Sequence, residues 1–212
     1  MIRAFIFDMD GVIVDSEGIM TPIIVKMLKN YGITISEEDL RKSMGQRLDE
    51  TVLRIAEEQN KTIDIDEFME KRDNLYKLLA KDKLKIFPEA VELIKKLKEQ
   101  NFLVAVSTSG NRIKANINVG IAQIKDYLDA VTNGDEVEHS KPDPHIYSIT
   151  AEKLQVPPED CIVIEDTPNG ITAAKRAGMK CIGITNSFSK DKLEEADIIV
   201  DNLNEININE IN

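Results

Sequence analysis

The stretch "FIFDMDGVIVDSE", residues 5–17, places carboxylates directly after an apolar run. The run stops at Asp8, and Asp10 follows two residues later. Aspartate is almost never fully buried unless it is paired or bound to a cation. The stretch therefore predicts a buried strand whose end meets a positive charge. The plainer alternative is an ordinary strand followed by a turn.

Further apolar runs indicate the sheet to which this strand belongs. Each run is compact rather than alternating, as expected for parallel strands that helices cover on both faces. The predicted strands span residues 2–7, 102–107, 161–165 and 180–185, with a fifth candidate at 197–202. The helical patterns between them span residues 88–100, 143–155 and 168–178. This alternation predicts the α/β class, with a doubly wound, Rossmann-like parallel sheet.

Residues 16–83 interrupt that alternation. They contain no convincing strand, and their four helical patterns span residues 20–32, 36–45, 49–60 and 64–80. We therefore expect an α/β core made of residues 1–15 and 84–212, with an inserted four-helix cap made of residues 16–83. Asp15 and Ser16 would form the first hinge into the cap, and the second would lie near residues 83–88.

Composition and charge narrow the class of protein. The chain has 212 residues, of which 42% are hydrophobic, as in a globular protein rather than a disordered one. Its formal net charge of -11 argues against nucleic acid and anionic membranes as partners, because both attract basic patches. No window approaches the roughly 18 consecutive apolar residues of a membrane span.

Cysteine usage and the first residues favour the cytoplasm. The two cysteines, Cys161 and Cys181, form neither a CxxC pair nor a dense framework, which suits a reducing compartment. We expect both in the core. The opening "MIRAFIFD" is too short and too acidic downstream for a signal peptide. A cytoplasmic protein that acts as a monomer is expected.

Polar residues follow the predicted strands at their carboxyl ends, where open α/β sheets hold ligands. They are Asp8 and Asp10 after the first strand, Ser107, Thr108 and Ser109 after the second, and Glu165 and Asp166 after the third. Lys141 lies in the loop "SKPDP", just before a helical pattern. Like charges packed together need a cation, and oxygen ligands favour a hard one such as Mg²⁺.

Four motifs carry a resemblance to a known family. They are "DMDGVIVDSE" (8–17), "VSTSGNR" (106–112), "SKPDPHIY" (140–147) and "IEDTPNGI" (164–171). In this order and spacing they resemble the four motifs of the haloacid dehalogenase-like superfamily. Over essentially its whole length the chain is similar to the helical-cap branch, which contains β-phosphoglucomutase and many sugar-phosphate phosphatases.

The resemblance implies a role for each motif residue. Asp8 would be the nucleophile that forms an aspartyl-phosphate, and Asp10 would be the general acid and base. The Ser107 hydroxyl and the Thr108 amide would hold phosphate oxygens, and Lys141 would tie the phosphate to Asp8. The implied phosphate-binding set is Met9, Asp10, Ser107, Thr108 and Lys141.

The resemblance also implies a Mg²⁺ site. The ion would lie between Asp8, the Asp10 carbonyl and Asp166, and would screen the repulsion between a carboxylate and a phosphate. Glu165 would be a direct ligand or would lie just behind the ligands, and both readings stay open. Dehalogenases and phosphonatases of the superfamily lack an Asp two residues after the nucleophile, so Asp10 favours phosphate ester chemistry.

The predicted cap is where the resemblance implies substrate contacts. Arg47 lies in a segment similar to the loop that faces the catalytic site, and Arg72 falls where the mutase carries a substrate-binding lysine. Ser109 and Asn111 would contact the substrate from the core. Closure of the cap would exclude water and complete the site.

Two departures from the mutase pattern favour hydrolysis. Met20 stands where the mutase has a histidine, and Leu48 stands where its cap loop has an arginine, with Arg47 one residue earlier. A mutase must hold both phosphates of a bisphosphate intermediate, whereas a phosphatase needs one phosphate site. We therefore expect a Mg²⁺-dependent phosphatase that acts on a small phosphorylated metabolite, such as a sugar phosphate.

Three alternatives stay open. The first is a hexose phosphomutase similar to β-phosphoglucomutase. The second is a signalling receiver domain, which also surrounds a phosphorylated Asp with acidic residues, a hydroxyl and a lysine, but has no helical insert. The third is a binding protein that kept the site without turnover.

Overall fold

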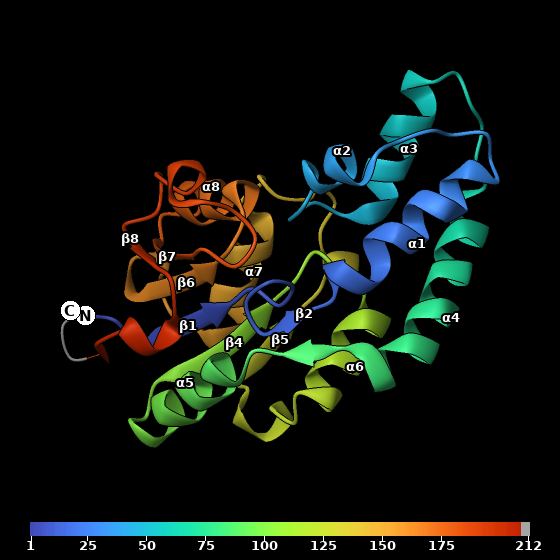
Figure 1. Ribbon diagram of the computed structural model, residues 1–212. Helices are drawn as coiled ribbons and strands as arrows, with labels where there is room; N and C mark the ends of the chain where they lie inside the picture. Colours follow the sequence, from blue (N-terminus) through green and yellow to red (C-terminus); the bar gives the residue numbers. More distant parts are fainter. Residues whose placement is uncertain (209–212) are drawn as a thin grey trace.

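The computed structural model describes residues 1–208, and residues 209–212, the end of the predicted core, lie outside the described part. A six-stranded parallel sheet with the order β5-β4-β1-β6-β7-β8 lies between helices. Four helices form a second lobe beside it (Figure 1). The predicted α/β class with a doubly wound parallel sheet is confirmed.

The strand that leads to Asp8 lies in the middle of this sheet. The six strands are β1 (Ala4–Phe7), β4 (Leu103–Ser107), β5 (Ala130–Thr132), β6 (Cys161–Glu165), β7 (Lys180–Ile184) and β8 (Ile198–Val200). β1 pairs with β4 on one side and with β6 on the other. The carboxyl ends of these three strands therefore meet at one edge, as the sequence predicts.

Helices occupy much of the remaining chain. The core helices are α5 (Pro88–Glu99), α6 (Arg112–Ile121), α7 (His145–Leu154) and α8 (Pro168–Arg176). The four helices of the second lobe, called the helical lobe from here on, are α1 (Glu17–Lys29), α2 (Glu37–Arg41), α3 (Leu48–Glu58) and α4 (Ile65–Lys83). Short 3-10 turns are η1 (Lys125–Tyr127), η2 (Gly134–Glu136), η3 (Pro158–Asp160), η4 (Lys190–Lys192) and η5 (Leu203–Glu205).

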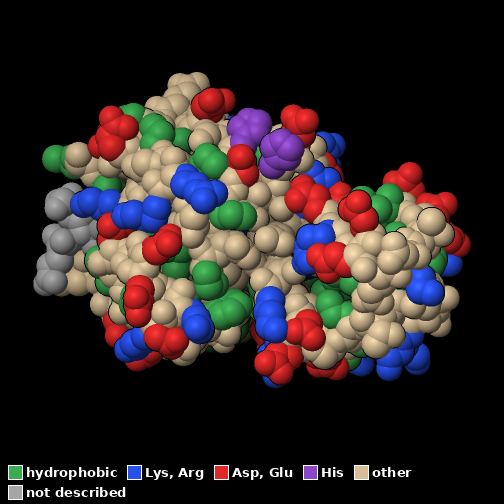
Figure 2. All heavy atoms as spheres, turned by 90° about the horizontal axis from the view of Figure 1, so that it is seen from above, with side chains coloured by type: hydrophobic (Ala, Val, Ile, Leu, Met, Phe, Trp, Pro, Cys, Tyr) green, Lys and Arg blue, Asp and Glu red, His purple; other side chains and the backbone are tan. Residues whose placement is uncertain are grey.

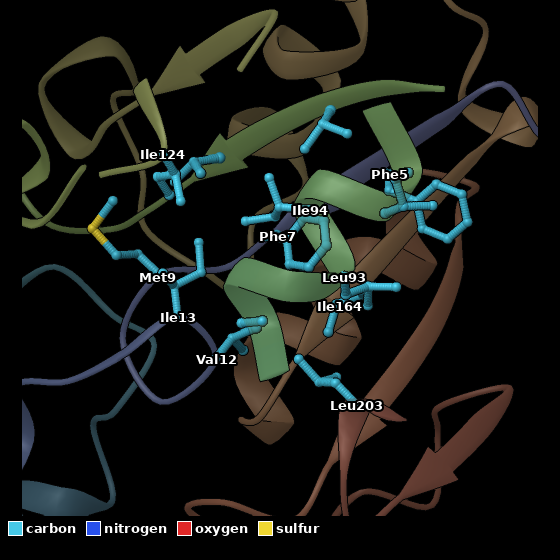
Figure 3. Close-up of a cluster of buried hydrophobic side chains, with 14 of the residues drawn as sticks. Phe5, Phe7, Met9, Val12, Ile13, Leu93, Ile94, Ile124, Ile164 and Leu203 are labelled. Carbon is cyan, nitrogen blue, oxygen red and sulfur yellow. The ribbon is translucent and has the colours of Figure 1, made fainter. Parts of the chain in front are cut away.

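Alternation along β1 explains why helices cover both faces of the sheet. Phe5 and Phe7 belong to the cluster that packs against α5 and α6 (Figure 3). Ala4 and Ile6 belong to the opposite cluster, which includes side chains of α7 and α8. Successive side chains of a strand point to opposite faces, so a strand that is covered on both faces reads as one continuous apolar run.

The helical lobe buries a hydrophobic core of its own. Leu28, Val52 and Phe68 in this lobe are fully buried, and Tyr76 is almost so. Between residues 17 and 83, all of which the structure describes, there are four helices and no strand. The predicted helical content is confirmed, while the assignment of residues 16–83 to a separate cap domain stays a prediction.

A two-stranded ribbon joins the helical lobe to the core. β2 (Val14–Asp15) pairs antiparallel with β3 (Lys85–Ile86). The Phe87 amide also donates to the Ile13 carbonyl at 2.9 Å. The chain therefore leaves and re-enters the core through two neighbouring segments, which coincide with the two predicted hinges.

The sequence does not predict β5 and α6. β5 has three residues, two of them only partly buried, and lies at an edge of the sheet, so it lacks a compact apolar run. Along α6, "RIKANINVGI", two asparagines and a glycine interrupt the apolar positions and weaken the helical pattern. Both elements form because neighbouring elements complete their burial, which local sequence does not record.

The cysteines, the helices and the charged surface can be compared with the predictions from composition. Cys161 and Cys181 are both buried and unpaired, as predicted. Among residues 1–208, no helix is long and apolar enough to cross a membrane. Figure 2 shows acidic and basic side chains interspersed on one face, several of them beside the seam between the two lobes.

Candidate active site

A cavity of about 320 Å³ lies between the carboxyl edge of the sheet and the helical lobe. Core residues that line it include Asp8, Asp10 and Thr108, and the helical lobe contributes Arg47 and Arg72 among others. The cavity therefore brings together residues from strand ends and from helices that are far apart in the sequence.

Asp8 lies at the core side of this cavity with a lysine on one of its oxygens. Lys141 Nζ is 2.5 Å from Asp8 Oδ1, and the side chain of Lys141 is fully buried. Burial raises the pKa of Asp8 to about 7, although the positive charge of Lys141 acts in the opposite direction. Burial alone would lower the pKa of Lys141, but Asp8 and Glu165 raise it, so the lysine stays charged.

Glu165 holds Lys141 in place. Its Oε1 accepts from Lys141 Nζ at 2.7 Å and from Tyr147 OH at 3.0 Å. Its Oε2 accepts from the amides of Asp166 and Thr167, both at 2.8 Å, and from the Thr167 hydroxyl. These five hydrogen bonds engage both oxygens, which favours the reading in which Glu165 lies just behind the metal ligands and positions Lys141.

Asp166 is a buried carboxylate whose charge no neighbouring cation contacts directly among the described residues. It is fully buried, and neither of its side-chain oxygens makes a hydrogen bond of normal geometry among the described residues, although the nearby Ser187 hydroxyl and Lys141 act to lower its pKa. Burial raises its pKa well above the usual value, and the nearby Glu165 and Asp8 raise it further. A buried carboxylate without a contacting cation is costly, so this position is suited to one.

The donor set at this edge fits Mg²⁺. Asp8 and Asp166 supply carboxylate oxygens, and a Cβ added at Gly11, which has φ +85°, would lie 1.8 Å from Asp166 Oδ2. Within residues 1–208, no three His, Cys, Asp or Glu side chains form a metal site by themselves. Two carboxylates completed by a main-chain carbonyl, water and phosphate oxygens are the usual environment of Mg²⁺.

The hydroxyl and amide donors after β4 differ in their availability. Ser107 is fully buried, its Oγ has no partner among the described residues, and it does not line the cavity, so its contact with phosphate stays a prediction. The Thr108 amide was expected to face phosphate, but it donates to the Thr132 carbonyl at 3.0 Å. Pairing with β5 continues one residue past the end of β4, which removes that donor. The Met9 side chain packs in the core, so only its main chain could meet phosphate.

Both carboxylate oxygens of Asp10 are held by neighbours. Lys114 Nζ lies 2.8 Å from Asp10 Oδ2, and the Ser16 hydroxyl donates to Oδ1. Burial would lower the pKa of Lys114, but the charges of Asp10, Tyr76 and Glu17 outweigh burial and raise it. A protonated lysine therefore compensates the charge of Asp10 beside the cavity.

Sequence reasoning missed Lys114, although a signal was present. The Asn111 side chain caps α6 by accepting from the Lys114 amide at 3.0 Å, so Lys114 stands in the first turn of this helix. Arg112 stands there too, and no acidic residue does. Cations are unfavourable at a helix N-terminus because of the helix dipole. A lysine kept there against the dipole is a reason to look for a nearby carboxylate.

Arg47 lines the cavity, but its guanidinium is already engaged. Nε and NH2 donate to the carboxylate of Asp49 at 3.1 and 2.5 Å, and NH1 donates to the Val137 carbonyl at 2.8 Å. The hydrogen bonds to Asp49 raise the pKa of Arg47 further. In this conformation a donor of Arg47 connects the helical lobe to the core, and substrate binding by Arg47 stays a prediction.

The other three predicted substrate contacts line the cavity with different degrees of freedom. Ser109 Oγ donates to the Gly45 carbonyl at 2.6 Å, and Asn111 Nδ2 donates to Asp73 Oδ2 at 2.7 Å. Both side chains thus bridge to the helical lobe. Arg72 is buried and pairs with Asp73 at 3.0 Å, while its Nε has no partner among the described residues. Arg72 is the one of the four with a donor to spare.

Comparisons with known proteins agree with this geometry. The chain is 33% identical over 216 residues to Protein SUPPRESSOR OF QUENCHING 1, chloroplastic, of Arabidopsis thaliana; the match covers 99% of the chain but only 20% of that protein. It is 30% identical to the phosphorylated carbohydrates phosphatase of Thermotoga maritima, covering 90% of the chain and 88% of that protein. The chain thus spans a fifth of one relative and most of another.

A solved structure and a family model support the same assignment. The structure is similar to the crystal structure of β-phosphoglucomutase from Clostridium difficile, with a TM-score of 0.86, 27% identity, and coverage of 99% of this chain and 95% of that one. The model of the haloacid dehalogenase-like hydrolases matches residues 5–184. Since this match spans most of the chain and includes the edge that carries Asp8, Lys141 and Asp166, the chain belongs to the haloacid dehalogenase-like hydrolase family.

Proposed function

We propose that the protein is a Mg²⁺-dependent phosphatase that hydrolyses a small phosphomonoester through an aspartyl-phosphate on Asp8. The observation that carries the proposal is the pair of Asp8 and Lys141, 2.5 Å apart, beside the Asp166 carboxylate, which no cation contacts directly among the described residues. A nucleophilic carboxylate, a fixed cation and a set of oxygen ligands for a metal ion are what phosphoryl transfer to aspartate requires. The match to a phosphatase of phosphorylated carbohydrates supports the same reaction.

In the first step, an oxygen of Asp8 attacks phosphorus, and the bond between phosphorus and the alcohol oxygen breaks. Lys141, which is bonded to Asp8, and the Ser107 hydroxyl, which has no partner among the described residues, would stabilise the phosphoryl oxygens. Asp8 and Asp166, with the Asp10 carbonyl, would hold Mg²⁺, which when bound offsets the repulsion between carboxylate and phosphate. Water then attacks the aspartyl-phosphate and releases inorganic phosphate.

Asp10 would protonate the leaving alcohol and then take a proton from water. In the present conformation its oxygens are bound by Lys114 and by the Ser16 hydroxyl, so proton transfer requires that at least one of them yields. Ser16 lies at the ribbon that joins the lobes, next to β2. Small movements of the helical lobe would therefore free Asp10, in agreement with a role of this lobe as a cap over the site.

A hexose phosphomutase is the second candidate, favoured by the likeness to β-phosphoglucomutase. The charges in the cavity favour hydrolysis. Its three cationic lining residues are Arg47, Arg72 and Lys114, and each forms an ion pair with a carboxylate. A bisphosphate intermediate needs a cationic site for its second phosphate, and these pairs leave little positive charge for it.

The proposal is tested with p-nitrophenyl phosphate and Mg²⁺. Asp8→Asn should lose hydrolysis altogether, and Asp10→Asn should still form the acyl phosphate, trapped by acid quench, but should turn over at least about a hundredfold more slowly. Asp126→Asn, an exposed aspartate, is the control and should behave as the wild type. Turnover retained by Asp8→Asn would refute the nucleophile.

The same assay separates the alternatives. A receiver domain would be phosphorylated once on Asp8 and would show no multiple turnover. A binding protein would show neither reaction. Incubation with β-glucose 1-phosphate and catalytic glucose bisphosphate tests the mutase, because glucose 6-phosphate formed without free phosphate would refute the phosphatase.

A further inference from the structure

We propose that the alcohol part of the substrate carries a hydrocarbon face and no second anionic group. This inference rests on the proposed phosphatase function and adds the chemical class of the leaving group. It is carried by the apolar side chains that the helical lobe contributes to the cavity, and by the charge balance of the cavity.

One side of the cavity is formed by apolar side chains that the fold leaves incompletely buried. We call this set the apolar wall, and its members are Met44, Leu48, Leu53, Ile65 and Met69. All five come from the helical lobe: from the loop before α3, from α3 itself and from α4. The core side, in contrast, carries Asp8, Asp10 and Thr108. A phosphate bound on the core side would therefore leave its alcohol facing hydrocarbon.

Leu53 is the most exposed member of the apolar wall. It is 45% exposed, whereas its neighbour Val52 on α3 is fully buried in the core of the helical lobe. Met69 on α4 is likewise only partly buried. Apolar side chains gathered at a cavity and open to solvent mark ligand-binding surfaces.

The charges of the cavity oppose a second anionic group. Each of its three cations is paired with a carboxylate, as described above. Glu17, Asp66 and Asp135 add further carboxylates to the lining. An anionic group at the far end would meet mainly apolar and acidic surface, and Arg72, itself paired with Asp73, is the one lining cation with a donor left over.

The size of the cavity sets the size of the alcohol. A volume of about 320 Å³ corresponds to roughly ten water molecules at about 30 Å³ each. A phosphate with an alcohol of about six carbons has a similar number of non-hydrogen atoms. An alcohol of about six carbons therefore matches the cavity in size.

A series of n-alkyl phosphates tests the inference. Ethyl, butyl and hexyl phosphate have leaving groups of nearly equal acidity, so differences in kcat/KM report binding of the chain. With Mg²⁺, kcat/KM should rise from ethyl to hexyl by up to about fourfold for each methylene that is buried. Hexane-1,6-diol bisphosphate should be at least about tenfold poorer than hexyl phosphate because its second phosphate is unpaired.

Variants assign the effect to the apolar wall. Leu53→Asn and Met69→Gln should flatten the rise with chain length while hydrolysis of ethyl phosphate changes little. Leu53 is half-exposed, so its replacement should leave the protein folded, and thermal melting checks this. The matched control is Leu78→Asn, a position on α4 that is 71% exposed and does not line the cavity. This control should keep the wild-type slope.

The outcomes separate this inference from the proposed function. If the wild type hydrolyses p-nitrophenyl phosphate but kcat/KM is flat from ethyl to hexyl, or if the bisphosphate is the better substrate, the inference is wrong and the phosphatase stands. A slope that survives in both Leu53→Asn and Met69→Gln also overturns the inference. If no ester is hydrolysed, p-nitrophenyl phosphate included, both the phosphatase and the inference fall.

Discussion

Asp8 and Asp166 are neighbouring carboxylates, and only one of them has a fixed cation. Lys141 compensates Asp8 at 2.5 Å, whereas Asp166 makes no hydrogen bond of normal geometry among the described residues. Burial raises the pKa of both, to about 7 for Asp8. A site with this imbalance binds either protons or a metal ion, and pH decides which of them prevails.

The stability of the metal-free protein should fall as pH rises from about 4 to 7. The pKa of Asp8 is higher in the folded state than its usual 3.8, so in this window the folded state binds more protons than the unfolded state. Stability contributed by that proton is lost as the carboxyl ionises, up to about 4 kcal/mol for Asp8 alone. Urea unfolding in a chelator at several pH values measures this loss.

Mg²⁺ should reverse the trend, because the ion binds deprotonated carboxylates. We expect Mg²⁺ to raise the melting temperature more at pH 8 than at pH 6, and Asp166→Asn to abolish most of that difference. An equal shift at both pH values, or a shift that persists in Asp166→Asn, would contradict this assignment of the ligands.

Lys114 contacts groups from both lobes. It pairs with Asp10 at 2.8 Å and lies 5.5 Å from the centre of the Tyr76 ring. Glu17, whose pKa is raised chiefly by burial, lies near the same ammonium. The lysine therefore compensates the charge of the proposed acid and base at the point where the core meets the helical lobe.

At the scale of elements, the residue that begins α1 uses its side chain for Asp10 rather than for capping the helix. Ser16 is the N-cap residue of α1, yet its side chain makes no capping hydrogen bond. Its hydroxyl donates to Asp10 instead. Ser36, in contrast, caps α2 by accepting from the Asp39 amide at 3.0 Å. The same residue type thus serves an active-site carboxylate at one helix and the backbone at another.

These two serines should separate activity from stability. Ser16→Ala should raise kcat by up to about fivefold, because Asp10 no longer has to give up this hydrogen bond, worth about 1 kcal/mol, before proton transfer. Ser36→Ala should leave kcat unchanged but should cost about 1 kcal/mol of unfolding free energy through loss of the cap. Steady-state kinetics and urea unfolding on both variants test this, and equal effects on kcat would refute the role of Ser16.

At the scale of the whole molecule, polar contacts hold the helical lobe against the core. They include Arg47 with the Val137 carbonyl, Ser109 with the Gly45 carbonyl, Asn111 with Asp73, Asn169 with the Met44 carbonyl, and Ser140 with Glu50. Hydrogen bonds of this kind exchange readily with water, so their net contribution to stability is modest. An interface held in this way can open to admit substrate and then close.

Arg47→Gln should loosen this closure. The variant loses the hydrogen bond to the Val137 carbonyl and the paired contacts to Asp49. We expect a larger radius of gyration by small-angle X-ray scattering and about a fivefold lower kcat/KM. Arg54→Gln is the matched control, because the contacts of Arg54, to Glu58 and Ser43, stay within the helical lobe. An unchanged radius of gyration in Arg47→Gln would contradict the role of this arginine in closure.

The central part of the fold and of the candidate site could be predicted from the sequence. β1, β4 and β6 follow from compact apolar runs, and their carboxyl ends meet because parallel strands share one direction. Asp8 and Asp166 come directly after β1 and β6, whereas Lys141 lies in the loop before α7 and follows only from its motif. Helix α6 and strand β5 could not be predicted, since their burial depends on neighbours rather than on their own pattern.

The chain alone thus specifies the reactive edge, because local apolar runs and short motifs place Asp8 and its partners there. The tertiary structure decides the contacts between segments that are far apart in the sequence. It uses the Thr108 amide for β5, turns Arg47 toward Val137, and sets Lys114 on Asp10. The apolar wall, too, exists only where α3 and α4 face the sheet. Distance along the chain carries no information about these contacts, whereas packing of the two lobes brings them within hydrogen-bonding reach.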